Sequence, residues 1–140
     1  MKTRIALLSF ILFVSAGLSF AQKATETLKV KIEANEWDSN LLLKKLNDHG
    51  AGHGLKFEAV EQGYEYRITF ATGQRKNTLL ALAGAGAVNY SEAGVAAYDA
   101  NGNELFKFVR ANRYTDSGAA NAAAKEIIKR LVKLRKARDK

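Results

Sequence analysis

Apolar and polar residues alternate with a period of two in several separate stretches of the chain, and this alternation constrains the fold more than any other feature. The clearest stretch is "TLKVKIEANEW", residues 27–37, whose apolar residues share one face: Leu28, Val30, Ile32 and Ala34. A strand with this period has one buried face and one face open to water. The chain must therefore supply helices or a second sheet to cover the apolar faces.

A second region of alternation, residues 55–70, predicts an antiparallel hairpin. Its two alternating segments are separated by Glu61-Gln62-Gly63, a sequence typical of a turn. The second segment carries an aromatic and aliphatic face that we expect to pack against helices, formed by Tyr64, Tyr66, Ile68 and Phe70.

A third region, residues 94–110, predicts another antiparallel hairpin. Asn101-Gly102 is the dipeptide that a two-residue type I′ turn prefers, because both central positions of that turn need a positive φ. A turn centred there pairs Ala97 with Phe106 and Val95 with Phe108 across the two strands.

The period changes to that of a helix in two places. Around residues 38–50, Asp38 or Ser39 can cap a short helix, and Gly50 is expected to end it in the left-handed conformation. Its apolar stripe is Leu42, Leu43 and Leu46.

The second helix is longer and closes the chain. Asp116 or Ser117 can cap it, and no proline interrupts it before the last residue. Apolar residues at spacings of three and four predict its buried stripe: Ala120, Ala124, Ile127, Leu131 and Leu134.

These elements predict an α+β fold, a two-layer sandwich in which an antiparallel sheet of about five strands carries two helices on one face. The open face of the sheet is expected to hold the polar positions Lys29, Lys31, Glu33, Glu65 and Arg67. Residues 73–94 are harder to assign, because Leu79–Val88 is a run of small or apolar residues that fits a buried strand or a helix. Its glycines count against both, and we favour a strand.

The first 21 residues have the pattern of a cleaved secretory signal peptide. Lys2 and Arg4 precede an apolar run, and Ser19-Phe20-Ala21 places small residues where a signal peptidase cleaves. An uncleaved anchor helix is the alternative, although the run is shorter than the roughly 20 residues that span a bilayer. We therefore expect residues 22–140 to form a single periplasmic or secreted domain without a transmembrane span. The chain has no cysteine, so no disulfide stabilises that domain.

The positive charge of the chain is concentrated at its end. The whole chain has a formal net charge of +8. Residues 125–140 hold eight basic and two acidic residues, whereas residues 22–124 hold 12 of each sign. Cations there oppose the helix dipole, and they also predict binding to an anionic membrane, to lipopolysaccharide or to an acidic envelope protein. The candidate binding residues are Lys125, Lys129, Arg130, Lys133 and Lys136.

Nucleic acid is a less suitable partner for this helix. No aromatic residues lie between its charges, as they do in many single-strand binding surfaces. An exported protein also meets little nucleic acid. The sequon Asn89-Tyr90-Ser91 fits N-glycosylation, which depends on a host that glycosylates exported proteins.

Both histidines of the chain lie in "NDHGAGHG", residues 47–54. His49 and His53 would share a helix face at a spacing that zinc sites use, with Asp48 as a carboxylate ligand, which would suit a small metal-dependent hydrolase. Gly50 and Gly52 favour the alternative, in which the helix stops and a loop follows. No nucleophile has a recognisable base beside it, so we predict neither an enzyme nor a bound cofactor.

The layout of the chain resembles that of a known group of domains. The segments that carry the resemblance are "VKIEANEWDSNLLLKKLNDHG", "LKFEAVEQGYEYRITF" and "VAAYDANGNELFKFVRANRYTDSGAANAAAKEIIKRL". Their order resembles small exported α+β domains of bacterial envelope proteins, such as the amino-terminal domain of TolB. The resemblance implies a non-catalytic accessory or partner-binding domain in the periplasm, and it transfers no functional residue.

Overall fold

The computed structural model describes residues 24–76 and 89–140. The predicted signal peptide over residues 1–21 and the predicted strand over residues 79–88 lie outside these ranges. The described elements are, in chain order, β1 (Glu26–Glu33), α1 (Glu36–Gly50), the short 3₁₀ helix η1 (Ala51–His53), β2 (Leu55–Ala59), β3 (Tyr66–Lys76), β4 (Asn89–Asp99), β5 (Glu104–Arg113) and α3 (Asp116–Arg138).

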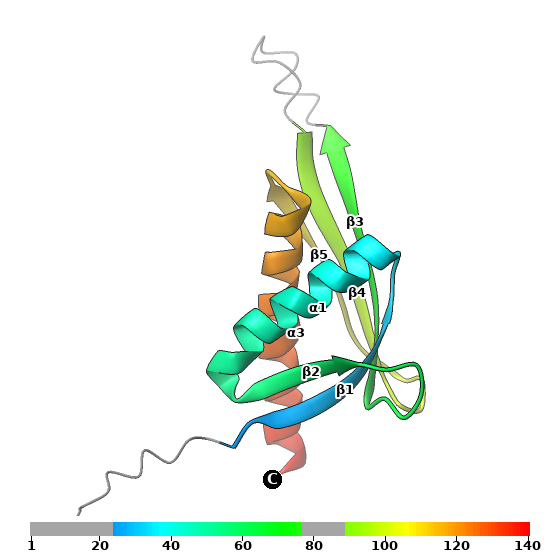
Figure 1. Ribbon diagram of the computed structural model, residues 1–140, viewed down its shortest axis with the longest axis vertical. Coiled ribbons are helices and arrows are strands. Elements are labelled where there is room, and N and C mark those ends of the chain that lie inside the picture. Colours follow the sequence, from blue (N-terminus) through cyan, green and yellow to red (C-terminus); the bar gives the residue numbers. More distant parts are fainter. Residues whose placement is uncertain (1–23, 77–88) are drawn as a thin grey trace, which may run out of the picture.

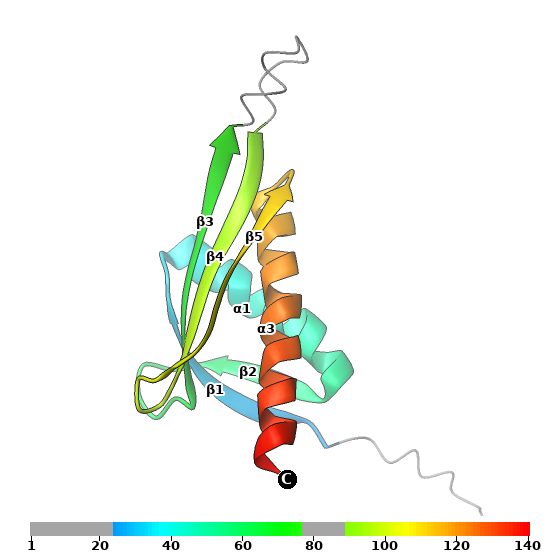
Figure 2. The same ribbon diagram turned by 180° about the vertical axis from the view of Figure 1, so that it is seen from behind.

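The predicted α+β class and two-layer arrangement are confirmed. Five strands form one sheet in the order β2-β1-β3-β4-β5, and α1 and α3 pack against it and against each other (Figures 1 and 2). The sheet is mixed rather than fully antiparallel. β1 pairs in parallel with both of its neighbours, whereas β3, β4 and β5 are antiparallel.

The predicted hairpin over residues 55–70 is wrong. β2 runs parallel to β1 beside its first half, and β3 runs parallel to β1 beside its second half, so that Ala59 and Tyr66 both lie level with Val30. Residues 60–65 cross from one side of β1 to the other. Backbone hydrogen bonds from the Val60 N–H to the Val30 carbonyl and from the Glu65 N–H to the Lys29 carbonyl hold this crossing against β1.

The second predicted hairpin is confirmed, with the register expected: Ala97 lies opposite Phe106 and Val95 lies opposite Phe108. The turn itself differs from the prediction. The Gly102 N–H donates to the Asp99 carbonyl and the Asp99 N–H donates to the Asn103 carbonyl, while Gly102 has a φ of +86°. This is a three-residue loop with a glycine bulge rather than a two-residue type I′ turn.

Both helices begin earlier than predicted. Asn35 caps α1 by accepting a hydrogen bond from the Asp38 N–H, and Thr115 caps α3 by accepting from the Gly118 N–H. Asp38 and Asp116, two of the predicted caps, lie in the first turns instead, where their carboxylates interact favourably with the positive end of the helix dipole.

The first-turn carboxylates connect the helices to the sheet. Asp38 is buried and accepts hydrogen bonds from Thr72 Oγ1 at 2.7 Å and from the Thr72 N–H at 3.2 Å. Asp116 accepts from the buried Ser91 Oγ at 2.7 Å. One such contact joins α1 to β3 and the other joins α3 to β4, so both helix starts are fixed on the central strands.

The end of α1 also differs from the prediction. α1 ends at Gly50, but the chain continues through η1, and the left-handed residue is Gly54 with a φ of +68°. Gly50 is required for a different reason. A Cβ at this position would lie 2.8 Å from the Leu55 carbonyl oxygen and 3.0 Å from the Phe57 ring.

The core lies between the helices and the inner face of the sheet. The predicted buried stripe of α3 is confirmed for Ala120, Ala124, Ile127 and Leu131, with Leu134 partly buried. Three further α3 residues are buried as well: Ala119, Ala123 and Ile128. The inner face of β3 is the predicted aromatic and aliphatic one, since Tyr66, Ile68 and Phe70 are all buried.

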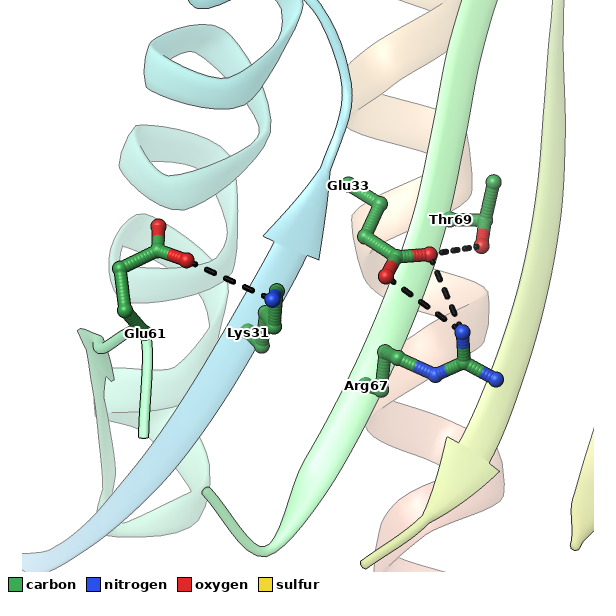
Figure 3. A network of polar contacts seen from close by, with 5 residues as sticks. All are labelled: Lys31, Glu33, Glu61, Arg67 and Thr69. Atoms are coloured by element: carbon green, nitrogen blue, oxygen red, sulfur yellow. Dashed lines mark hydrogen bonds and ion pairs between the residues drawn. The ribbon is translucent and has the colours of Figure 1, made fainter. Parts of the chain in front are cut away.

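The outer face of the sheet carries a polar network where β1 meets β3 (Figure 3). Arg67 Nη1 lies 3.3 Å from Glu33 Oε2, which also accepts a hydrogen bond from Thr69. Lys31 pairs with Glu61 of the crossing segment at 3.4 Å. Glu65, also predicted for this face, instead reaches Arg135 of α3 at 3.8 Å.

Candidate anion-binding site

Four of the predicted binding residues lie along one exposed side of α3. Lys125, Lys129, Lys133 and Lys136 are all exposed and follow one another at spacings of four, four and three residues. The buried stripe fixes the rotation of the helix on the sheet, because its apolar residues occupy the opposite side. Within residues 24–76 and 89–140, none of these four lysines forms an ion pair.

Arg130, the fifth predicted residue, has intramolecular partners. Its Nε donates to Glu126 at 2.8 Å, and its guanidinium group lies 5.5 Å from the centre of the Phe106 ring and 5.0 Å from that of Phe108. The two rings stack on each other with their centroids 6.0 Å apart. Arg130 therefore covers an aromatic pair at the edge of the sheet while keeping its positive charge near the lysines.

Two arginines of β5 also belong to this site, and neither was among the binding residues predicted from the sequence. Arg110 Nη2 lies 2.5 Å from Glu126 Oε2, and Arg113 lines the same hollow as Arg110. The signal for Arg110 was present in the predicted strand. It lies two residues after Phe108, so the period of the strand places both on the helix-facing side.

These residues line two adjoining hollows between β5 and α3, here called the β5/α3 groove. The first has a volume of about 540 Å³ and is lined by Arg110, Arg113, Gly118, Asn121, Ala122, Lys125, Glu126 and Lys129. The second has a volume of about 510 Å³ and is lined by Leu105, Phe106, Glu126, Lys129, Arg130, Lys133, Leu134 and Ala137. Glu126 and Lys129 belong to both, so the two hollows adjoin along the helix.

Glu126 is the one acidic residue among those lining the groove. Its hydrogen bond with Arg130, and then the hydrogen bond and charge of Arg110, hold its pKa below the ordinary value although burial opposes this. The carboxylate thus stays ionised and neutralises part of the charge of the two arginines. Arg113, Lys125, Lys129 and Lys133 keep an excess of positive charge in the groove.

The two histidines of residues 47–54 have different surroundings. His49 Nε2 lies 2.6 Å from Asn121 Oδ1, so the ring N–H donates to the amide oxygen and joins α1 to α3. Asp48 pairs with Lys44 at 3.2 Å, and His53 is exposed on η1. Among the residues that the structure describes, no group of three or more histidine, aspartate or glutamate side chains is placed to hold a metal ion.

The apolar side of α3 is not available to a membrane. Ile127 and Leu131 have no exposed surface, since they pack into the core. In the described part of the chain, no helix is both long enough and apolar enough to cross a bilayer. An anionic ligand would therefore meet α3 through its lysines and the polar groove.

No protein-family model matches the chain, and no curated protein matches it. Among solved structures, the chain is similar to a point variant of PelC, a dodecamer from Paraburkholderia phytofirmans, with a TM-score of 0.41 and 17% identical residues. The match covers 78% of this chain and 85% of that one. This degree of similarity establishes neither a shared fold nor a shared function.

Proposed function

We propose that this protein is an exported, non-catalytic binding domain of the bacterial envelope whose β5/α3 groove binds an acidic segment of a partner protein. The observation that carries the proposal is the charge of the groove. Apart from Arg110 and Arg130, four exposed cations line it, and the single carboxylate among the lining residues is already bonded to those two arginines. Electrostatic complementarity of this kind favours and steers an acidic partner.

The envelope location is proposed from the first 21 residues and from the resemblance of the sequence layout to small envelope domains. The signal-peptide pattern supports export, and the absence of cysteine suits a domain that folds without disulfides.

A protein segment fits the groove better than a lipid surface does. Helices that lie on membranes insert an apolar face between lipid headgroups, and the apolar face of α3 is buried against the sheet. The cationic surface is also concave, with β5 forming its second wall. A chain of carboxylates can enter a groove, whereas a flat membrane reaches mainly the outermost lysines.

The proposal is tested with a pair of double variants that change the net charge equally. Lys129→Gln with Lys133→Gln removes two groove charges, and Lys29→Gln with Lys56→Gln removes two exposed charges from β1 and β2. The probe is a fluorescent polyglutamate peptide, titrated at low and at physiological ionic strength. We expect the groove variant to weaken binding about tenfold and the control variant to leave it within about twofold, with weaker binding at higher salt.

Two results would contradict the proposal. Equal effects of both double variants would show attraction to net charge rather than to the groove. Binding to anionic phospholipid vesicles with no binding to the peptide would favour the membrane alternative, in which Lys136 also contributes.

A further inference from the structure

We infer that the acidic segment binds in an extended conformation, as an added strand along the open edge of β5, with alternate carboxylates directed at the lysines of α3. The inference rests on the proposed function, because it specifies how the β5/α3 groove holds its partner. It comes from one juxtaposition: among the described strands β5 has an unpaired edge, and residues of β5 line the same groove as a row of cations on α3.

Among the strands that the structure describes, β5 lies at the end of the sheet and pairs with β4 alone. Figure 2 shows β5 beside α3. In an edge strand, alternate residues direct their N–H and C=O groups away from the sheet. From Phe106 to Arg110 the pairing with β4 is regular, since the two irregularities lie outside this stretch. A stretch of this kind is a template for a further strand.

At the opposite edge of the sheet, formed by β2, a side chain bonds to the strand backbone. There, the side chain of Asn47 on α1 donates to the Phe57 carbonyl at 3.1 Å and accepts from the Phe57 N–H at 2.8 Å. The amide of Asn47 thus takes the place of a neighbouring strand at β2. Across the described residues, no side chain is bonded to the backbone of Phe106–Arg110. In the described part of the chain, the β2 edge is thus covered at Phe57 and the β5 edge is open.

The spacing of the lysines matches that of an extended chain. Residues four apart on a helix are separated by about 6 Å along its axis, which applies to Lys125, Lys129 and Lys133. Alternate residues of a strand lie about 6.6 Å apart and share one face. A peptide with glutamate at every second position can therefore place successive carboxylates near successive lysines.

The residues between the carboxylates would face the other side of the sheet. There, Val109 of β5 is 61% exposed, although it is a large apolar residue. A β-branched residue on the added strand would cover it, as cross-strand neighbours do within sheets. The geometry thus selects a segment in which acidic residues alternate with β-branched ones.

The test uses a nine-residue peptide of alternating glutamate and threonine with the purified protein. Two derivatives carry backbone N-methyl groups, one on the glutamates and one on the threonines, so the charge is the same in all three. Only one set of N–H groups can face β5 in an added strand. We expect one derivative to bind about tenfold more weakly or worse and the other to bind within about threefold of the parent. We also expect the parent to slow hydrogen exchange at amides within Phe106–Arg110.

The outcomes separate the inference from the proposed function. Equal binding of all three peptides, with unchanged exchange along β5, overturns strand addition but leaves acidic binding by the groove intact. Failure of every acidic peptide to bind overturns both. A peptide with the same composition but five consecutive glutamates is the control for spacing, and tighter binding of that peptide would contradict the match to the lysines.

Discussion

At the scale of single residues, Glu126 determines both the charge of the groove and part of the stability of α3. Its side chain is only 15% exposed and is bonded to Arg110 and Arg130, which lowers its pKa from the ordinary value of 4.5. A carboxyl whose pKa is lower in the folded state adds stability above its unfolded pKa. That stability is lost as the pH falls through the folded value.

Glu126→Gln is therefore expected to lower the free energy of unfolding by about 1–2 kcal/mol at pH 7 and by less below pH 4. Urea unfolding at a series of pH values measures the difference, with Glu58→Gln on the exposed side of β2 as the control for a lost surface charge. The same substitution removes the negative charge of the groove and raises its net charge by one, so acidic peptides should bind more tightly. A loss of stability that is the same at pH 3 and pH 7 would contradict the role of the carboxylate charge.

Gly50 and Gly52 form a matched pair of glycines with opposite expectations. A methyl group at Gly50 would meet the Leu55 carbonyl and the Phe57 ring, whereas one at Gly52 would meet nothing within 4 Å. We expect Gly50→Ala to lower the free energy of unfolding by about 1–3 kcal/mol, because backbone must move. Gly52→Ala should leave it unchanged or raise it slightly, since alanine has less freedom in the unfolded chain. Thermal unfolding of both variants measures the difference. Equal shifts in Tm would refute the close approach of β2 to Gly50.

At the scale of elements, the two sheet edges predict different responses to substitution. Asn47→Ala removes both hydrogen bonds to the backbone of Phe57 and leaves that edge unsatisfied. We expect a loss of about 1–3 kcal/mol in the free energy of unfolding and faster aggregation. Asn40→Ala, on the exposed side of the same helix, should have a much smaller effect. Similar losses in the two variants would show that Asn47 acts only through the helix.

The periodicity of the strands predicted which side chains are buried, but not which strands are neighbours. Phe57 and Ile68 fall on the inner face whether β2 and β3 form a hairpin or lie on either side of β1. The local turn signal at Gly63, with a φ of +69°, favoured the hairpin. Backbone hydrogen bonds instead place β2 and β3 on either side of β1. Such long-range bonds leave no local pattern in the sequence.

The candidate site was predictable only in part for a similar reason. The lysines of α3 follow from charge clustering along one helix, which is a local property. Arg110 and Arg113 join them because β5 is an edge strand lying against α3, which depends on the strand order. The pairing of Glu126 with two arginines likewise requires the helix and the strand to be placed first.

At the scale of the whole molecule, the positive charge lies on one side of an otherwise neutral body. Residues 22–124 contain equal numbers of acidic and basic residues, so the whole excess of residues 22–140 lies in residues 125–140. A molecule with this distribution presents different potentials in different orientations. Its binding to an anionic surface then depends on the position of each charge as well as on the net charge.

Cation-exchange chromatography of the two double variants measures this dependence without any assumption about the partner. Lys129→Gln with Lys133→Gln and Lys29→Gln with Lys56→Gln lower the net charge by the same amount. If retention followed net charge alone, both would elute at the same salt concentration. We expect the groove variant to elute at a clearly lower salt concentration, because the protein adsorbs through the side where its charge is concentrated. Coelution would mean that the α3 lysines form no distinct cationic face, and the proposed groove would lose its electrostatic basis.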